Sequence, residues 1–468
     1  MSNPSFKPAL ILHGGAGNIH RSKLPPDLYK KYHASLTSYL RSTRDMLYNG
    51  GSALDAAVHA VALMEDDELF NCGRGSVFTS AGTIEMEASV MVTSLQHPEG
   101  GEREEEGEIK RGAGVMGLKN VRNPIKLARE ALLRTGIDSS GEHRDDGGSM
   151  HSQLVAPYVE ELAKEWGLEF KPDEWFWTKR RWDEHRRGLH GTGQELYSET
   201  QQQVSGESGP VIDEVPSQGT VGCVCLDQWG NLAVATSTGG MTNKWPGRVG
   251  DTPTLGAGFW AEEWETSNPY SNAEPDGKEV KGGGVMSFVS EIRSLLGDCL
   301  PPVFRSAAMS YTPIPAAPVN AYTDEKQSLA YRSSSKVASR RAAAVSGTGN
   351  GDSFLRTAAA RTACAMLRFS SPSSNPCNLA EAVTAVVGPG GELQRSAGKR
   401  WGKTGEGEGG MIGIEAEADC DKSDGEKQLR KGKVVFDFNS NGMWRAWVEE
   451  DANGRDRERV MVFREEYH

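Results

Sequence analysis

Apolar and polar residues along the N-terminal half of the chain predict a mixture of strands and helices. An apolar run at residues 9–13 enters a glycine cluster and predicts a strand followed by a tight turn. Residues 84–92 predict a second strand. Helices are predicted at residues 26–47, 52–65 and 124–133. Ser52 and Asp55 are spaced as the N-cap and first turn of the second helix, and a proline opens the third.

The strongest strand signal of the chain begins at Thr220. The string TVGCVCLD, a turn at residues 228–231 and a second apolar run at 232–237 together predict a hairpin. Further strands are expected at residues 284–289, 342–346, 411–414, 433–438 and 443–448, and helices at 353–368 and 379–387. Both halves of the chain therefore combine strands with helices.

Five polar segments between these elements read as inserted surface loops, because their compositions bury too little apolar surface to order themselves. They are residues 98–111, 191–218, 266–283, 301–341 and 415–431. The segment 191–218 is expected to be flexible and ends directly before the hairpin. Cleavage of the backbone at this point would therefore disturb the fold least.

Composition narrows the functional classes. With 37% apolar and 25% charged residues in 468, the chain has the make-up of an ordinary globular protein. A formal net charge of −12 argues against nucleic acid and anionic membranes as partners and favours a small-molecule or dipeptide substrate. No run approaches the ~20 apolar residues of a membrane helix, so a cytoplasmic protein is expected.

The cysteines and tryptophans have structural interpretations. Seven cysteines without a C-x-x-C pair indicate reduced thiols, and Cys223 and Cys225, on one face of a strand, favour core packing over a zinc site. No metal site is predicted. Trp175, Trp177 and Trp182 are expected to pack a partly exposed helix. His13 is expected to make a structural hydrogen bond.

The dipeptide Gly219-Thr220 is a candidate site of chemistry. If the threonine hydroxyl attacks the preceding peptide bond, an acyl shift and hydrolysis release Thr220 as a new N-terminus. Its α-amine would have a pKa of about 7.7 to 8.0 and could act as a base near neutral pH. Alone this signal is weak. The string TSTGG, at the end of the hairpin, strengthens it because antiparallel strands return those hydroxyls to within about 5 Å.

Five strings, in order, resemble plant-type asparaginases and isoaspartyl peptidases, which are N-terminal-nucleophile hydrolases. They are HGGAG at 13–17, the segment from Ser52 to Phe78, GTVGCVCLDQWGNLAVATSTGGMTNKWPGRVGD from Gly219, SGTGNGDSFLRTAAAR from Ser346, and FNSNGMWRAW from Phe438. The resemblance implies hydrolysis of L-asparagine or β-aspartyl dipeptides through a β-aspartyl-threonine ester, without a cofactor.

The resemblance also assigns roles to single residues. It makes Thr220 the nucleophile, Thr238 the hydroxyl that orients it, and Thr348 with the Gly349 N–H the oxyanion hole. Asn71 would position the catalytic water or the nucleophile.

The substrate head group is assigned in the same way. Arg248 would pair with the α-carboxylate and Asp251 with the α-ammonium, beside Gly349 and Gly351. A surface pair between Arg248 and Asp251 is the alternative. One departure is Glu87, where the family usually carries Asp.

Fold and assembly follow from the resemblance. It implies an α+β fold, a four-layer αββα sandwich, made from a subunit of residues 1–219 and another of 220–468 that pair as a dimer of heterodimers. A sodium ion held by backbone carbonyls near Met64 to Cys72 is a possibility.

Three other functions remain open. A threonine aspartase-like endopeptidase is disfavoured by Asp251, and a glycosylasparaginase shares the string TGNGD at 348–352 but lacks HGGAG. A binding protein that never matures would not need Thr220.

Overall fold

The computed structural model describes residues 6–94, 111–134, 151–190, 219–267, 337–370, 377–419 and 429–467. The chain divides into two compact units, one formed by Met1–Trp264 with Arg340–His468 and the other by Glu265–Ser339. Almost all of the second unit lies outside the described residues, as do the strand predicted at 284–289 and the segment 191–218.

The larger sheet of the first unit holds the predicted hairpin at its centre. Its strand order is β14-β13-β2-β6-β7-β3-β4-β5, and β6 pairs antiparallel with both β2 and β7. The strands are β2 (Ala9–Gly17), β3 (Met86–Val92), β4 (Arg111–Leu118), β5 (Gln153–Val155), β6 (Val221–Leu226), β7 (Leu232–Thr238), β13 (Gly442–Glu450) and β14 (Asp456–Met461). Strands from before and after residue 219 therefore belong to one sheet, and β2 lies between strands from after it.

A second sheet has the order β12-β10-β9-β8. Its strands are β8 (Phe259–Ser267), β9 (Val337–Gly349), β10 (Gly409–Asp419) and β12 (Lys433–Phe438). A small parallel pair joins β1 (Phe6–Lys7) to β11 (Arg430–Lys431).

Side-chain caps mark the start of several helices. The Ser52 hydroxyl accepts a hydrogen bond from Asp55 N, and Asn378 and Glu381 form a capping box before α13. The main helices are α1 (Pro26–Tyr48), α2 (Ala53–Glu65), α3 (Pro124–Arg134), α4 (Tyr158–Glu165), α5 (Asp173–Phe176), α6 (Lys179–His190), α11 (Gly351–Thr357), α12 (Ala359–Phe369), α13 (Leu379–Val387) and α14 (Glu392–Ser396). Among these described helices, none combines the length and apolarity that a bilayer crossing demands.

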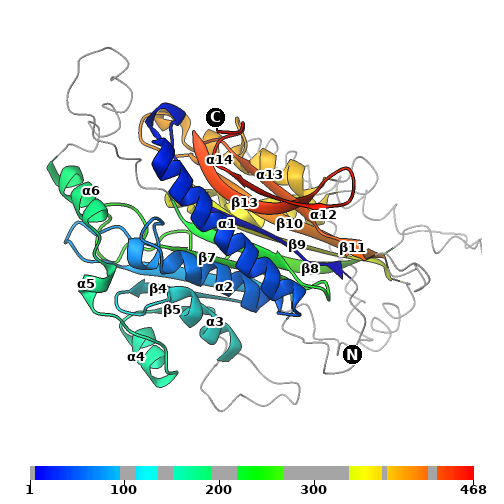
Figure 1. Ribbon diagram of the computed structural model, residues 1–468, viewed down its shortest axis with the longest axis horizontal. Coiled ribbons are helices and arrows are strands. Elements are labelled where there is room, and N and C mark those ends of the chain that lie inside the picture. Colours follow the sequence, from blue (N-terminus) through cyan, green and yellow to red (C-terminus); the bar gives the residue numbers. More distant parts are fainter. Residues whose placement is uncertain are drawn as a thin grey trace, which may run out of the picture. The chain divides into compact units, whose positions relative to one another are not determined.

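Alternation of side chains divides the apolar residues into three buried clusters. In β6, Val221 and Cys223 join the cluster beneath α1, α2 and α3, whereas Val224 joins the cluster between the sheets. In β9, Ala344 faces that same middle cluster and Val345 faces α12 and α13. This period of two explains why the hairpin reads as a continuous apolar run, since both of its faces are buried. Figure 1 shows α1 and α2 lying side by side over the larger sheet.

Several predicted boundaries are wrong. The helix predicted at 353–368 is two helices, because Ala358 adopts a left-handed backbone with φ 44° between them. The segments predicted as loops at 301–341 and 415–431 contribute residues to β9 and β10, where Arg341 and Glu415 form an ion pair of 2.6 Å. The loop predicted at 266–283 begins inside β8.

Candidate active site

Thr220 lies at the head of β6 and is buried in the continuous chain. Its Oγ1 is 3.3 Å from the hydroxyl of Thr252. Gly219, which precedes it, donates its N–H to the carbonyl of Ala16 at 3.2 Å. The bond between Gly219 and Thr220 therefore lies where an apolar strand meets polar groups, the Thr252 hydroxyl and the Ala16 carbonyl.

Thr348 and Gly349, at the end of β9, lie beside Gly219. A Cβ atom on Gly219 would lie 2.7 Å from Thr348 Oγ1 and 3.0 Å from Gly349 N. Thr348 Oγ1 accepts a hydrogen bond from Ala16 N at 3.0 Å, which leaves its own hydroxyl hydrogen able to donate. The two groups predicted to form the oxyanion hole are thus brought together next to the candidate cleavage site.

Thr238 and Asn71 organise the turn after the hairpin. Thr238 Oγ1 accepts from Gly240 N at 3.0 Å, and Asn71 donates its amide to the Gly240 carbonyl at 2.8 Å. The Asn71 side-chain oxygen accepts from Val77 N at 3.1 Å. These hydrogen bonds of Asn71 therefore brace the loop behind Thr238, which is a positioning role. Thr220 directly precedes Val221, which pairs with Ser237 in the antiparallel ladder, so the next position opposite Thr220 is Thr238.

The two residues predicted to read an amino-acid head group converge on Gly351. A Cβ atom there would lie 2.5 Å from Asp251 Oδ1 and 3.0 Å from Arg248 Nη2. Arg248 forms its ion pair with Asp352, on the first turn of α11, at 2.9 Å. Asp251 is buried, so a surface pair between Arg248 and Asp251 is not what the structure shows.

Glu87 is a second carboxylate near the Arg248 guanidinium. It lies on β3 in register with Thr238, and its Oε1 accepts from Gly250 N at 2.9 Å. Its Oε2 is buried without a hydrogen-bond partner among the described residues. A Cβ atom on Gly250 would lie 3.1 Å from this Oε2 and 2.8 Å from Arg248 Nη1.

The burial and proximity of these charged side chains shift their pKa values. Burial, with the nearby charges of Glu87 and Asp352, raises the pKa of Asp251 to about 7 against the opposing effect of Arg248. Burial also raises the pKa of Glu87 and lowers the pKa of Lys244. Asp251 therefore changes its charge within the physiological range.

Two buried polar contacts support the hairpin from behind. Ser237 donates to Glu65 at 2.6 Å, and burial raises the pKa of Glu65 to about 8. His13 Nε2 lies 2.8 Å from the hydroxyl of Ser346, and burial lowers the pKa of His13 to about 3. His13 is therefore neutral at physiological pH, which agrees with the structural role expected for it.

Helix α6 holds the glycine loop that carries Asn71. Arg180 donates to the carbonyls of Glu68 and Leu69, and Arg181 donates to the Gly75 carbonyl at 2.8 Å. Trp182 of the same helix packs against Phe78 in an edge-to-face contact. Arg180, Arg181 and Trp182 thus pack against the protein itself, whereas Trp177 is exposed.

A known protein family matches the part of the chain that contains Thr220. Residues 6–266, more than half of the chain, match the family model described as asparaginase. The chain belongs to the asparaginase family. The resemblance seen in the sequence is confirmed.

Relatives of this asparaginase-family chain carry consistent names. It is 36% identical to the isoaspartyl peptidase of Escherichia coli over 255 residues, which are 54% of this chain and 68% of the relative. It is 35% identical to the isoaspartyl peptidase of Salmonella typhimurium, over 54% of this chain and 70% of the relative. A human isoaspartyl peptidase/L-asparaginase is 32% identical over 55% of this chain and 68% of its own length.

Part of the candidate site lies beyond the residues matched to the asparaginase family. Thr348, Gly349 and Asp352 follow residue 266, where the match ends, and a long segment separates them from it. β9 nevertheless returns Thr348 to Gly219. The fold therefore brings residues from outside the matched range into contact with the candidate site.

Sequence reasoning did not find every residue of this asparaginase-family site. Thr252 and Asp352 were not predicted, although both directly follow residues that were. The contact of Ser237 with Glu65 joins positions that are 172 residues apart. Nothing in the local sequence marks such a contact.

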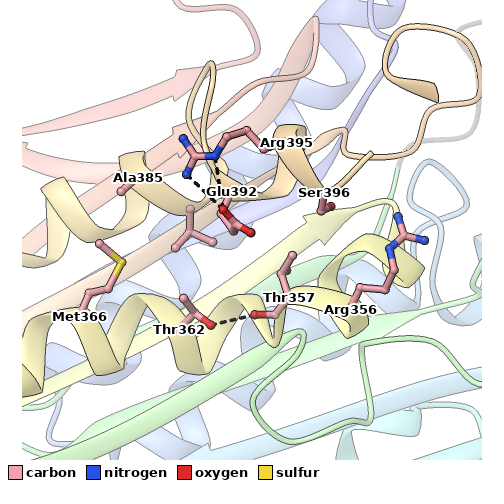
Figure 2. Close-up of a pocket in the computed structure, with 9 residues that line it drawn as sticks. Arg356, Thr357, Thr362, Met366, Ala385, Glu392, Arg395 and Ser396 are labelled. Carbon is pink, nitrogen blue, oxygen red and sulfur yellow. Dashed lines mark hydrogen bonds and ion pairs between the residues drawn. The ribbon is translucent and has the colours of Figure 1, made fainter. Parts of the chain in front are cut away.

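A separate cavity of about 520 Å³ lies between α11, α12, α13 and α14 (Figure 2). Its polar side chains satisfy one another, as Arg395 does with Glu392 at 3.1 Å and Thr362 with the Thr357 carbonyl at 2.8 Å. None of the predicted site residues lines it. The chemistry is better placed at Thr220, where donors and charged side chains converge.

Proposed function

We propose that this protein is a self-cleaving threonine amidohydrolase that hydrolyses L-asparagine and β-aspartyl dipeptides. The observation that carries the proposal is the position of Gly219, which occupies the space beside Thr348 Oγ1 and Gly349 N immediately before a buried threonine. The names of the relatives, isoaspartyl peptidase and L-asparaginase, support the substrate class.

Maturation would begin at the Gly219 carbonyl. The Thr220 hydroxyl attacks this carbonyl, the peptide nitrogen leaves as an amine, and an ester joins Gly219 to Thr220 Oγ1. Water then cleaves the ester, which leaves a carboxylate on Gly219 and a free α-amine on Thr220. Because β6 pairs with β2 and β7 pairs with β3, the two chains stay joined through the sheet after the cut.

Hydrolysis of substrate would use the groups that maturation exposes. Departure of Gly219 opens the space beside Thr348 and Gly349 to the substrate's side-chain carbonyl. The α-amine of Thr220, with a pKa of about 7.7 to 8.0 in its ordinary range, takes the hydroxyl proton and returns it to the leaving amine. Donors to the developing oxyanion commonly contribute about 10² to 10³ in rate each. Water then releases L-aspartate from the ester.

Arg248 and Asp251 would hold the aspartyl head group. A guanidinium can bind a carboxylate through two parallel hydrogen bonds, and an ionised Asp251 attracts an ammonium. The buried position of Asp251 suits a small amino-acid head group better than a protein segment. This observation favours a dipeptidase or asparaginase over the endopeptidase alternative.

The fold supports the finer structural proposals. The three buried clusters follow the order of helices, sheet, sheet and helices expected of a four-layer αββα sandwich. The cut at Thr220 would create subunits of residues 1–219 and 220–468. Their pairing as a dimer of heterodimers and the cytoplasmic location stay predictions.

The loop from Glu65 to Gly75 fits a structural sodium ion. A Cβ atom on Gly73 would lie 2.2 Å from the Glu65 carbonyl oxygen, and one on Gly75 would lie 2.0 Å from the Phe70 carbonyl oxygen. The two glycines thus let the backbone pass close to these carbonyl oxygens, and oxygen ligands suit hard cations. We propose that these carbonyls hold the ion and fix the loop that carries Asn71.

The proposal is tested by assaying ammonia release from L-asparagine and amine release from β-aspartyl-leucine with purified wild-type protein and Thr220→Ala. The wild type should hydrolyse at least one substrate, and Thr220→Ala should fold, remain a single chain and be inactive. Hydrolysis of either substrate by Thr220→Ala would overturn the mechanism. Thr43→Ala, which changes a buried threonine of α1 remote from the site, serves as the control.

A further inference from the structure

Three carboxylates surround the Arg248 guanidinium, and they differ sharply in exposure. Asp251 and Glu87 are buried, whereas the Asp352 side chain is 53% exposed. Asp352 is also the one that forms the ion pair with Arg248 among the described residues. The guanidinium that should bind a substrate carboxylate is therefore already occupied by a carboxylate of the protein.

We propose that Asp352 is an exchangeable counterion of Arg248, which the α-carboxylate of the substrate displaces on binding. This inference rests on the proposed function, since it concerns the head group of the same substrate. Asp352 becomes a specificity-determining residue, because only a ligand with a free α-carboxylate can take its place on the guanidinium.

Glu87 is held in place by the sheet, whereas the Asp352 side chain is free to move into solvent. Glu87 is tied to Gly250 N at 2.9 Å and lies within the sheet, so it cannot leave Arg248 without disturbing buried contacts. Asp352 has its backbone in α11 and its carboxylate at the protein surface, where water can solvate it after displacement. The backbone needs no movement for this exchange.

The energetic scale of the exchange is modest. Exposed ion pairs are usually worth little, and removing such a competitor should tighten ligand binding by about two- to five-fold. Loss of one negative charge beside Glu87 and Asp251 acts in the same direction, because L-aspartate carries a net negative charge. Asp352→Asn should therefore bind the ligand more tightly than the wild type does.

The experiment measures L-aspartate binding by calorimetry to the matured wild type, Asp352→Asn and Asp352→Glu. Glu392→Gln is the matched control, because Glu392 is 49% exposed and pairs with Arg395 instead of Arg248. We expect Asp352→Asn to bind about two- to five-fold more tightly and to lower KM for β-aspartyl-leucine by a similar factor, with kcat unchanged. Asp352→Glu and Glu392→Gln should stay near the wild type.

A second substrate tests whether the gain requires the α-carboxylate with which Asp352 would compete. The α-carboxamide form of β-aspartyl-leucine lacks the competing carboxylate, so Asp352→Asn should give it no comparable gain. Unchanged or weaker aspartate binding by Asp352→Asn, or an equal gain with the α-carboxamide, would overturn the inference. A wild type that hydrolyses neither asparagine nor β-aspartyl-leucine would instead overturn the proposed function, and this inference with it.

Discussion

Substitution of Gly219 by alanine tests whether the space in front of the oxyanion donors governs maturation. The added Cβ would lie 2.7 Å from Thr348 Oγ1, whereas ordinary contacts begin near 3.4 Å, so about 0.7 Å must be gained by movement. Gly349 N and the Ala16 carbonyl, at 3.0 and 3.1 Å, restrict the directions in which Gly219 can move. A misplacement of about 1 Å in a reacting group can cost about 10² in rate. We expect self-cleavage of Gly219→Ala to be slower by about one to two orders of magnitude.

The assay follows the intact mass of denatured samples during incubation at neutral pH, with thermal unfolding of the uncut chain measured in parallel. Gln218→Ala, which changes the neighbouring residue of the departing segment, is the control and should mature at the wild-type rate. Maturation of Gly219→Ala at that same rate would refute the reasoning, because it would show that the predicted crowding does not affect the attack.

Three further changes test separate parts of the structure. KM for L-asparagine should fall roughly ten-fold between pH 6 and pH 8, because only ionised Asp251, with its pKa raised to about 7, binds the α-ammonium; a profile that Asp251→Asn does not flatten would contradict this. Gly222→Ala should lower the free energy of unfolding by about 1 to 3 kcal/mol, measured by denaturant titration, because its Cβ would lie 2.2 Å from Ser346 Oγ; an unchanged midpoint would argue against it. Ser237→Ala should lower the free energy of unfolding by about 0.5 to 1.5 kcal/mol, because buried Glu65 loses one donor and keeps the Ile125 N–H, and an unchanged free energy of unfolding would contradict this.

The elements with strong local signals were predicted from sequence. The hairpin of β6 and β7 reads clearly because its apolar run is bounded by a turn, and α2 is marked by the Ser52 cap. β4 was missed because its string RGAGVMGL is rich in glycine, which ordinarily weakens a strand. The acidic composition at the end of β10 favours a loop, although its glutamates alternate with alanines as a strand requires.

The candidate site likewise contains residues that the local sequence predicts and contacts that it does not predict. Residues within or beside the hairpin, such as Thr220 and Thr238, follow from strand periodicity and from the family strings. The partnership of Arg248 with Asp352 does not, because it depends on how α11 is placed against a loop 104 residues earlier. The closeness of Glu87 to the guanidinium likewise comes from the pairing of β3 with β7. Sequence identifies the reacting groups, and the sheets determine which charges surround them.

The most direct measurement of the central claim is the mass of the purified protein under denaturing conditions, with the N-termini sequenced after incubation near neutral pH. Two chains, the second beginning at Thr220, are the result that a threonine nucleophile released by self-cleavage predicts. A single chain of 468 residues that nevertheless hydrolyses L-asparagine or β-aspartyl-leucine would contradict that claim.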